Sequence, residues 1–590
     1  MIDETIVGIV LFITLILFIW GKWRYDIVAL LALLSLVFLG IVPAKDAFFG
    51  FGHPAVITVA AVLVVSRGLE NSGLVILIAN WLRHLHATPI IQVTALTGII
   101  AILSAFMNNI GALAILMPVA LVMARENNYS PSLVLMPLAF GSLLGGMMTM
   151  IGTPPNIIIA NFRVRSSGYP FEMFDFTPVG LGVAIVGILF ISLIGWRLIP
   201  KRKGLVSPEE LFEIETYLTE LRVPEESKLQ GVSIGKLEES TKSDVLVMGI
   251  VRNRQKINSP STHEKLKKKD VLIVETDSEG MRELTESGQL ELVGDKDLGK
   301  EMLKSDSYRM MEAVITPRSS IIGKHAGSLN LRWRFGIHLL AVARQGVRIR
   351  ERLNKITLRS GDVLLLRGKD PEIHEALSSL GCLPLAERGL RIGAQRNIIF
   401  STLIFAIAIL CAAFSVVPVQ ISFVAAAVVM YMTGIIRTRE LYENIDWPII
   451  VLLGAMIPVG RALETTGGAE HIAGSIVSLA GDVHPLILVT LILTISMFLS
   501  DLINNAAAAI LMAPIGIQVA QEIKASPDPF LMSVAIGASC AFLTPIGHQS
   551  NALVFGPGGY KFQDYWKLGL PLEILIIIVS IPLLAHFWPL

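Results

Sequence analysis

The chain is poor in charge and in cysteine. Charged residues make up only 16% of its 590 positions and hydrophobic residues 53%, which is too apolar for a soluble globular protein. Its three cysteines, Cys382, Cys411 and Cys540, follow no pattern, so neither a disulfide framework nor a thiolate metal site is expected. The formal net charge of +1 favours no charged partner. We predict no nucleic-acid partner, no catalytic residues and no enzymatic activity.

The apolar runs that are present predict a polytopic α-helical membrane protein. Each is near the length that crosses the hydrocarbon layer: residues 6–20, 27–42, 89–106, 178–199, 398–416, 419–436, 486–499 and 568–587. The first run has no small-residue cleavage site after it and is followed by Lys22, Arg24 and a second run. We therefore interpret it as a retained helix rather than a signal peptide.

The chain carries one set of landmarks twice, always 394 to 396 residues apart. Chance apolar similarity would not hold one offset across four landmarks. The first set is Pro54, residues 67–70, Ser104 with Asn108, Asn109 and Pro118, and Gly152 with Asn156; the second is Pro448, residues 461–464, Ser500 with Asn504, Asn505 and Pro514, and Gly547 with Asn551. This duplication predicts a transporter of two membrane repeats, residues 1–200 and 397–590, with its binding site at the paired interruptions.

Between the repeats, the composition changes to that of a soluble protein. This insert repeats itself at a spacing of 92 residues: residues 229–237 return as 321–329, and residues 269–272 return as 361–364. Short β-rich runs at 245–251, 271–275, 338–342 and 363–367 predict two tandem α/β domains, at 206–292 and 304–388. No Gly-rich dinucleotide fingerprint follows a strand, so NAD or ATP binding by a Rossmann fold is not expected.

Basic residues on both sides of the insert indicate its location. They are Lys201, Arg202 and Lys203 before it, and Arg388, Arg391 and Arg396 after it. By the positive-inside rule, residues 201–396 face the cytoplasm from the cell (inner) membrane, and Arg437 and Arg439 agree with this orientation. Arg163 and Arg165 lie one span before the insert and would face outward, which conflicts with it. The flanks of the insert carry more charge, so we give them more weight.

The polar residues at the first interruption suit the binding of ions. Ser104 lies four residues before Asn108, and Ser500 four residues before Asn504, a spacing that puts each pair on one face of a helix. An asparagine amide offers an oxygen to a hard cation and an NH₂ group to an anion. If the helices break here, carbonyls can coordinate Na⁺ while helix N-termini face an anionic substrate. The alternative role, hydrogen bonding between helices, is disfavoured because the pair occurs twice.

The second interruption, residues 152–156 and 547–551, begins with glycine in both copies and contains two prolines in the first. Glycine permits a close approach of backbones and proline stops a helix, so we expect irregular backbone. At membrane depth such backbone persists only where it is buried in protein or lines a cavity.

These paired motifs resemble the divalent anion:sodium symporter family, within the ion-transporter superfamily that includes citrate, arsenite and Na⁺/H⁺ carriers. The similarity covers residues 1–200 and 397–590. It implies two repeats of inverted topology with broken helices and re-entrant hairpins, one Na⁺ at each broken tip, and the anion between them. It also implies a homodimer in the lipid bilayer that works by an elevator movement.

The family's Ser-Asn-Thr motif falls on residues 108–110 and 504–506. By resemblance, the first Na⁺ site is Ser104, Asn108, Asn109 and Gly152, the second is Ser500, Ile503, Asn505 and Gly547, and the substrate site is Asn108, Thr153, Asn504 and His548. The family threonine, which would bind a carboxylate, is replaced by Ile110 and Ala506. This departure favours a compact anion such as sulfate, with a dicarboxylate as the alternative.

The insert resembles two copies of the RCK-type C-terminal (Trk-associated) regulatory domain. The resemblance implies regulation by a small ligand, which in some potassium systems is cyclic di-AMP. Two such domains inside a permease are most similar to the sulfate-type branch of the family. They also raise a K⁺ channel or gating subunit as an alternative, but the chain lacks the TVGYG-type filter sequence.

Two ionisable residues distinguish the second repeat from the first. Asp501 replaces Ala105 and is a functional group by default at membrane depth; it could supply charge for Na⁺ or carry a proton, or else be structural. A Na⁺/H⁺ antiporter or metalloid carrier would depend on it, whereas a sensor that moves nothing would leave the duplication unexplained. His548 replaces Thr153 and would favour a dianion if protonated, or donate one hydrogen bond if neutral. The leading prediction is sodium-coupled symport of sulfate or a related divalent anion.

Overall fold

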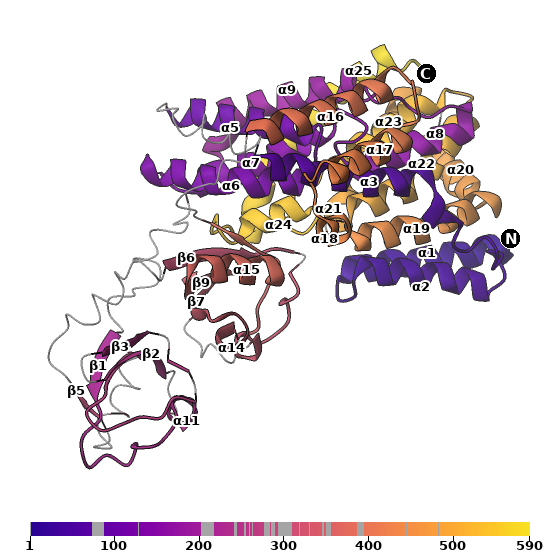
Figure 1. Ribbon diagram of the computed structural model, residues 1–590. Coiled ribbons are helices and arrows are strands. Elements are labelled where there is room, and N and C mark those ends of the chain that lie inside the picture. The colour runs from indigo at the N-terminus through magenta and orange to yellow at the C-terminus, as the bar shows by residue number, and fades with distance from the viewer. Residues whose placement is uncertain are drawn as a thin grey trace. The chain divides into compact units, whose positions relative to one another are not determined.

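The computed structural model describes residues 2–73, 88–127, 129–201, 395–443, 445–481 and 483–590, and shorter stretches from 218 to 385. The chain forms two compact units, whose elements are coloured by residue number in Figure 1. The helical unit comprises Met1–Lys201, Arg388–Val554 and Tyr560–Leu590, and the insert unit comprises Arg202–Glu387 with Phe555–Gly559. Several predicted features lie outside the described residues: Arg202, Lys203, Arg388 and Arg391, and the domain ends at 206–217, 304–308 and 386–388.

The helical unit contains two runs of helices. The first is α1 (Ile2–Trp20), α2 (Tyr25–Phe38), α3 (Pro54–Ser72), α5 (Pro89–Ser104), α6 (Asn109–Glu126), α7 (Ser132–Gly146), α8 (Pro154–Ser167) and α9 (Thr177–Leu193). The second is α16 (Gln395–Ala413), α17 (Val419–Met432), α18 (Thr438–Glu443), α19 (Trp447–Thr465), α20 (Gly468–Ala480), α21 (Pro485–Leu502), α22 (Asn505–Glu522), α23 (Pro527–Ser539), α24 (Gln549–Phe555) and α25 (Phe562–Phe587). Pro54, Pro89 and Pro485 each open a helix, because the first turn does not use the N–H group that proline lacks.

Among the described residues, five helices are long and apolar enough to cross a membrane: α1, α3, α19, α21 and α25. Shorter apolar helices, including α2, α5, α9, α16 and α17, account for the other predicted runs. The predicted runs missed α3 and α19, whose hydropathy of 1.4 and 1.5 is well below the 2.4 of α1. Both helices are mostly buried by protein rather than exposed, so they need less apolar surface. The helical unit thus has the architecture of a polytopic membrane protein, as predicted.

Equivalent helices of the two runs make equivalent contacts. α5 packs on α7 and α21 on α23, while α2 packs on α19 and α17 on α3. α9 and α25 pack against each other (Figure 1). On each of these two, a glycine meets an interruption: a Cβ on Gly180 would lie 2.3 Å from Met147 O, and one on Gly569 would lie 2.3 Å from Phe542 O. Only glycine permits these approaches. They let α9 pack against the segment that follows α7, and α25 against the segment that follows α23.

Arg163 joins the two halves of the helical unit. On α8, it makes a two-point ion pair with Asp528 on α23, with N–O distances of 2.9 and 2.7 Å. Its guanidinium also lies over the Phe171 ring at 4.4 Å. Since its charge is neutralised inside the unit, Arg163 no longer conflicts with the predicted orientation. The side chain of Arg165 lies outside the described residues.

Tyr560 makes a second link between the halves. Its hydroxyl accepts a hydrogen bond from the Met136 backbone N–H at 2.8 Å and donates to the Ser132 carbonyl on the same helix, α7. The ring is fully buried and packs edge-on against Tyr565. A residue from the second half of the chain therefore forms hydrogen bonds with backbone groups of α7 in the first half.

The described residues of the insert unit form two five-stranded sheets. The first has β1 (Leu218–Arg222), β2 (Val245–Arg252), β3 (Gln255–Asn258), β4 (Val271–Thr276) and β5 (Glu291–Leu292); the second has β6 (Arg309–Ile315), β7 (His338–Arg344), β8 (Val347–Arg348), β9 (Val363–Gly368) and β10 (Cys382–Pro384). Their orders, β3-β2-β4-β1-β5 and β10-β6-β9-β7-β8, coincide when the strands are matched at the 92-residue spacing. The accompanying helices are α11 (Ile234–Ser240), α14 (Leu331–Phe335) and α15 (Asp370–Leu380). The four predicted β-rich runs correspond to β2, β4, β7 and β9.

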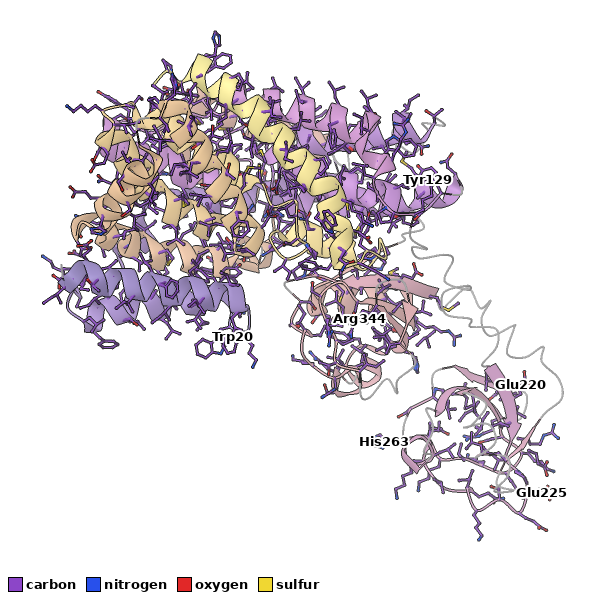
Figure 2. All side chains as sticks on the ribbon, turned by 180° about the vertical axis from the view of Figure 1, so that it is seen from behind. Trp20, Tyr129, Glu220, Glu225, His263 and Arg344 are labelled. Atoms are coloured by element: carbon purple, nitrogen blue, oxygen red, sulfur yellow. The ribbon has the colours of Figure 1, made fainter. Side chains whose placement is uncertain are left out.

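An arginine–aspartate pair recurs in both sheets. Arg252 donates from Nε and Nη2 to Asp270 at 2.9 and 2.8 Å, and Arg344, labelled in Figure 2, donates from both groups to Asp362 at 2.7 Å. Each carboxylate also accepts a backbone N–H from three residues earlier, at 2.8 and 2.9 Å, and is 1% exposed. The hydrogen bonds to Asp270 raise the pKa of the Arg252 guanidinium above its usual range.

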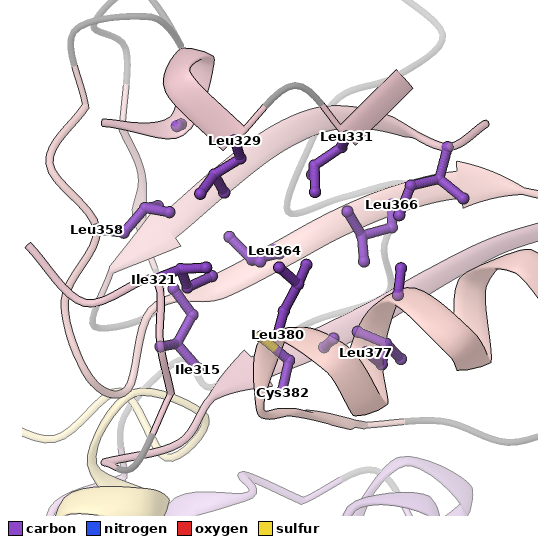
Figure 3. Packing of buried hydrophobic residues seen from close by; sticks show 14 of the residues in the cluster. Ile315, Ile321, Leu329, Leu331, Leu358, Leu364, Leu366, Leu377, Leu380 and Cys382 are labelled. Carbon is purple, nitrogen blue, oxygen red and sulfur yellow. The ribbon is translucent and has the colours of Figure 1, made fainter. Parts of the chain in front are cut away.

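The second sheet packs its core against α15 (Figure 3). Leu364 and Leu366 of β9 lie against Leu377 and Leu380 of α15, and all four are almost fully buried. Cys382, at the start of β10, is 5% exposed in this cluster. Burial raises the pKa of the Cys382 thiol to about 12, so the thiol stays neutral.

Candidate functional site

The first helix break lies between α5 and α6. α5 ends at Ser104 and α6 begins at Asn109, and the two side chains meet across the break, with Ser104 Oγ 2.5 Å from Asn109 Oδ1. When the amide is rotated by 180°, its nitrogen lies 3.2 Å from Ser142 O and 3.3 Å from Gly152 O. One end of the Asn109 amide is therefore surrounded by three oxygen atoms, a hydroxyl and two backbone carbonyls.

The second helix break, between α21 and α22, repeats this geometry. Ser500 Oγ lies 3.0 Å from Asn505 Oδ1 and 2.6 Å from the carbonyl oxygen of Ala538, which matches Ser142 in the first repeat. The single hydroxyl proton of Ser500 cannot serve both acceptors. Within the described residues, Nδ2 of Asn505 has no hydrogen-bond partner, although the residue is only 6% exposed. The second break thus gathers more oxygen acceptors than protons.

The first asparagine of each pair caps the helix that follows. Oδ1 of Asn108 accepts from the Ile110 N–H at 3.1 Å, and Asn504 caps α22 in the same way at 2.9 Å. The predicted helix face shared by Ser104 and Asn108 is wrong, because α5 ends at Ser104 and its contact across the break is to Asn109. The caps occupy the amide oxygens, so the NH₂ groups of both asparagines remain as donors for a further ligand.

Asn156 and Asn551 hold the second interruption of each repeat. These interruptions separate α7 from α8 and α23 from α24. Nδ2 of Asn156 donates to Thr149 O at 2.9 Å, and Nδ2 of Asn551 donates to Thr544 O at 3.1 Å. The hydroxyl of each threonine donates to a backbone carbonyl at the first break, one residue after the serine. The two interruptions of each repeat therefore form one connected polar cluster.

The two predicted glycines lie where no side chain fits. A Cβ on Gly152 would lie 2.5 Å from Gly146 O, and one on Gly547 would lie 2.8 Å from Ser500 O. Gly152 thus comes within reach of Asn109, and Gly547 lies against the end of α21. Ile503 leaves that helix in an extended conformation and is buried.

Thr153 and His548 precede the first turns of α8 and α24. Thr153 is 2% exposed, and His548 is half-buried. Nδ1 of His548 accepts a hydrogen bond from the Ser550 N–H at 3.0 Å, which places the proton of the neutral ring on Nε2. Of the two roles that the sequence left open for His548, this geometry favours the neutral ring that donates one hydrogen bond.

Asp501 has a partner that the sequence did not point to. Asp501 is 3% exposed, and its buried acidic neighbour is Glu573 on α25, which is 7% exposed. The sequence signal that could have identified Glu573 is its position as an acidic residue inside the last apolar run, 568–587. The backbone oxygens of Ser142 and Ala538 were also missed, because a carbonyl ligand has no sequence signature.

Nearly the whole length of the chain matches a known transporter family. The model of the citrate transporter family, CitMHS, matches residues 15–537 and 496–589. The chain belongs to this family. The predicted placement in the ion-transporter superfamily is thereby confirmed, while the finer features taken from the resemblance remain predictions.

Two relatives that align over nearly their full length are named transporters. The chain is 30% identical over 590 residues to an uncharacterized transporter of Synechocystis sp., covering 98% of this chain and 95% of that protein. It is 29% identical over 600 residues to the uncharacterized transporter YfbS of Escherichia coli, covering 98% of each. Sodium/sulfate cotransporter 2 of Chlamydomonas reinhardtii is 25% identical over 325 residues, 54% of this chain and 37% of that protein. These relatives support a membrane transporter rather than an enzyme.

Proposed function

We propose that this family member is a secondary active transporter that couples Na⁺ to the movement of a small divalent anion, with sulfate as the first anion to test. The observation that carries the proposal is the pair of matched helix breaks, in each of which a serine and an asparagine side chain meet backbone carbonyls. The match to citrate transporters and the relative named as a sodium/sulfate cotransporter support the same class.

The two oxygen clusters suit Na⁺. A hard cation takes hydroxyl, amide and carbonyl oxygens, and at the second break it would satisfy acceptors that share too few protons. No group of three or more His, Cys, Asp or Glu side chains in the described part of the chain could hold a transition metal. We propose one Na⁺ at each break, the first held by Ser104, Asn109, Gly152 and the cap residue Asn108, and the second by Ser500, Ile503, Asn505 and Gly547. The carbonyls of Ser142 and Ala538 extend these two sets.

The anion would lie between the breaks and be bound by neutral donors. These donors are the NH₂ groups of Asn108 and Asn504, the Thr153 hydroxyl and Nε2 of His548. The N-termini of α6 and α22 add partial positive charge. Ile110 and Ala506 offer no hydroxyl to a carboxylate, which favours a compact tetrahedral anion over a dicarboxylate.

The charges of two short connections support an inverted topology. The connection between α1 and α2 carries Lys22 and Arg24, whereas the one between α16 and α17, residues 414–418, carries no charge. An inverted arrangement puts the first connection in the cytoplasm with the insert and puts the second outside, as the positive-inside rule requires. The re-entrant hairpins, the homodimer and the elevator movement belong to this same proposal.

The insert would regulate transport. Two sheets of the same strand order, each with the same arginine–aspartate pair, make two copies of one module, as tandem RCK C-type domains would. A bound ligand can alter transport only by binding two transporter conformations with different affinity. Cyclic di-AMP is the first ligand to test.

Uptake into proteoliposomes tests the proposal. Labelled sulfate, succinate and citrate are offered with and without an inward Na⁺ gradient. We expect sulfate to accumulate only with the gradient. Accumulation of citrate or succinate in its place would replace the substrate, and uptake that ignores Na⁺ would contradict the coupling.

A proton-coupled exchanger or metalloid carrier is the second candidate function, favoured by the burial of Asp501 beside Glu573. The same vesicles, loaded with a pH-sensitive dye, distinguish it. Proton movement driven by Na⁺ in the absence of any anion would favour exchange, and uptake of arsenite would favour the metalloid carrier.

A further inference from the structure

Two distant segments of the chain meet at the start of α7. The Ser132 hydroxyl donates to the Pro200 carbonyl oxygen at 3.0 Å, and the Ser132 carbonyl oxygen accepts from the Tyr560 hydroxyl. The Tyr560 hydroxyl also accepts from the Met136 N–H at 2.8 Å. Ser132, Met136 and Tyr560 are fully buried, so water does not compete for these hydrogen bonds. The first turn of α7 is therefore fixed by residues 68 and 428 positions away.

Both segments lead directly into the insert unit. Pro200 lies two residues before Arg202, where the insert unit begins. Tyr560 directly follows Phe555–Gly559, the piece of the second repeat that belongs to the insert unit. The two partners of Ser132 thus lie next to places where the chain passes from one unit into the other.

Within the insert unit, the segment Phe555–Gly559 meets the second sheet at Gly361. A Cβ on Gly556 would overlap the Gly361 carbonyl oxygen, so only glycine permits this approach. Gly361 precedes β9 and has a φ of +83°. The matching residue of the first sheet, 92 positions earlier, is Lys269, whose side chain pairs with Glu225 at 2.8 Å. The first module therefore carries a charged side chain where the second presents bare backbone to the segment.

α7 leads from this junction to the first helix break. It is a single helix, Ser132–Gly146, and all of its residues are buried. At its far end, the Ser142 carbonyl oxygen lies 3.2 Å from the rotated amide nitrogen of Asn109. The Gly146 carbonyl oxygen accepts from Nδ2 of Asn156 at 3.3 Å. A 15-residue helix is about 22 Å long, and close packing transmits a displacement of its start to its end.

The matching helix of the second repeat, α23, is anchored differently. The Ser526 side chain caps it by accepting from the Asp528 N–H at 3.4 Å. Asp528 pairs in turn with Arg163 of α8, with N–O distances of 2.9 and 2.7 Å. All three residues belong to the helical unit. The start of α23 is thus held from within the helical unit, whereas the start of α7 is held by the segments that lead to the insert.

We propose that the insert acts on the first helix break and not on the second, and that α7 transmits the change. Movement of the insert shifts Pro200 and Phe555–Gly559. Ser132 and Tyr560 pass this shift to the start of α7, whose far end then alters the spacing of the oxygen atoms around Asn109. Ser132 and Tyr560 are therefore positioning residues for the first cation site. This inference rests on the proposed function, because it names the site at which the proposed regulation acts.

Hydrogen exchange of the purified full-length protein, in sodium chloride and in choline chloride, tests the inference. Residues 142–152 report on the first break, and residues 538–547 report on the second. In Tyr560→Phe and in Ser132→Ala, buried hydrogen bonds are lost at the start of α7. We expect residues 142–152 to exchange at least about threefold faster than in the wild type and to be less protected by Na⁺, with residues 538–547 unchanged.

Tyr565→Phe is the matched control. It removes a hydroxyl from an equally buried ring, but the hydrogen bond that is lost goes to the Asn551 carbonyl oxygen, at 2.7 Å, in the second interruption. This variant should therefore speed exchange in residues 538–547 and leave residues 142–152 unchanged.

Gly556→Ala tests the connection to the insert. The new Cβ has no room beside Gly361, so the segment is displaced from the second sheet, and exchange in residues 142–152 should rise as it does in Tyr560→Phe. Because both changes interrupt one path, the double variant should differ little from the more affected single variant. Gly474→Ala, where a Cβ meets nothing within 4 Å, controls for the added methyl group.

Wild-type exchange of residues 142–152 in Tyr560→Phe and Ser132→Ala, or an equal rise at both breaks, would overturn the inference. Additive effects of Gly556→Ala and Tyr560→Phe would also overturn it, because they would show two independent paths. If Na⁺ protects neither break in the wild-type protein, the proposed cation sites are wrong. Exchange in choline chloride then still decides whether α7 connects the insert to the first break.

Discussion

Ser104 Oγ and Asn109 Oδ1 lie 2.5 Å apart, although one helix ends at the first residue and the next begins at the second. Ser500 and Asn505 make the equivalent contact at 3.0 Å. These side-chain contacts close each break, in addition to backbone hydrogen bonds such as that from the Met107 N–H to Leu103 O at 3.0 Å. Removing one amide should therefore alter the site more than the fold.

We expect Asn109→Ala and Asn505→Ala each to abolish Na⁺-dependent uptake, because a cation site loses an oxygen that the bilayer cannot replace. The matched control is Asn161→Ala, since Asn161 donates to its own helix, at 2.8 Å to Ile157 O. Uptake and thermal unfolding of the purified protein are measured together. Wild-type Na⁺ dependence in either cluster variant would refute the assignment of a site to that break.

His548→Asn should raise the KM for the anion about tenfold and leave the Na⁺ dependence unchanged. Asparagine can keep the cap of α24 that Nδ1 now provides to the Ser550 N–H, but it lacks a donor at the position of Nε2. His548→Gln, which restores a donor near Nε2, should recover part of the affinity. An anion KM that does not change in His548→Asn would show that the residue is only a cap.

Cys382 should resist alkylation in the folded protein. Its thiol is buried with a pKa of about 12, so almost no thiolate exists at neutral pH. Because the unfolded thiol ionises near its ordinary value of 9.0, the second sheet should lose stability as pH rises from about 9 to about 12. Mass spectrometry of the labelled peptide, with and without denaturant, measures both effects. Cys382→Ala should remove this contribution to the pH dependence.

Asp362→Ala should destabilise the second sheet by roughly 1–3 kcal/mol, because Arg344 and a backbone N–H lose a buried acceptor. Earlier labelling of Cys382 with increasing urea reports the change. Asp270→Ala is the matched control: it removes the same contact from the first sheet and should leave Cys382 protected. Equal exposure of Cys382 in both variants would mean that the two sheets unfold together.

Replacing residues 203–388 by a short flexible linker should preserve Na⁺-coupled uptake and abolish its response to a cytoplasmic nucleotide. The membrane helices and both helix breaks belong to the helical unit, whose core does not include these residues. Uptake and substrate binding are compared in vesicles containing the shortened and the complete chain. A folded shortened protein that binds the anion but cannot move it would make the insert part of the moving machinery.

The local breaks in this fold could be read from sequence, because glycine, proline and asparagine act on the backbone where they stand. The predicted run 89–106 corresponds to α5, Pro89–Ser104, and the run 486–499 lies within α21, Pro485–Leu502. α3 and α19 were missed, since a helix enclosed by protein needs no long apolar run. The hydropathy of a helix reports its contact with lipid, and these two have little.

Side-chain partnerships were harder to predict. The second asparagine of each pair, rather than the first, meets the serine, because the break changes the helical spacing on which the prediction depended. Glu573 lies in an apolar run with no motif around it, and only the packing of α25 against α21 brings it to Asp501. A contact between residues 72 positions apart leaves no local pattern in a single sequence.

The ion pair between Arg163 and Asp528 also has a consequence for the synthesis of the protein and its insertion into the membrane. The two residues are 365 positions apart, so at ordinary translation speeds the ribosome makes the second about 20 to 70 seconds after the first. Throughout that time α8 has emerged while its arginine lacks its final counter-ion, and the insert is synthesised before the partner helix exists. The nascent first half must therefore be tolerated by the membrane as an incomplete, charged intermediate, and a chain truncated within the insert should be a substrate for degradation.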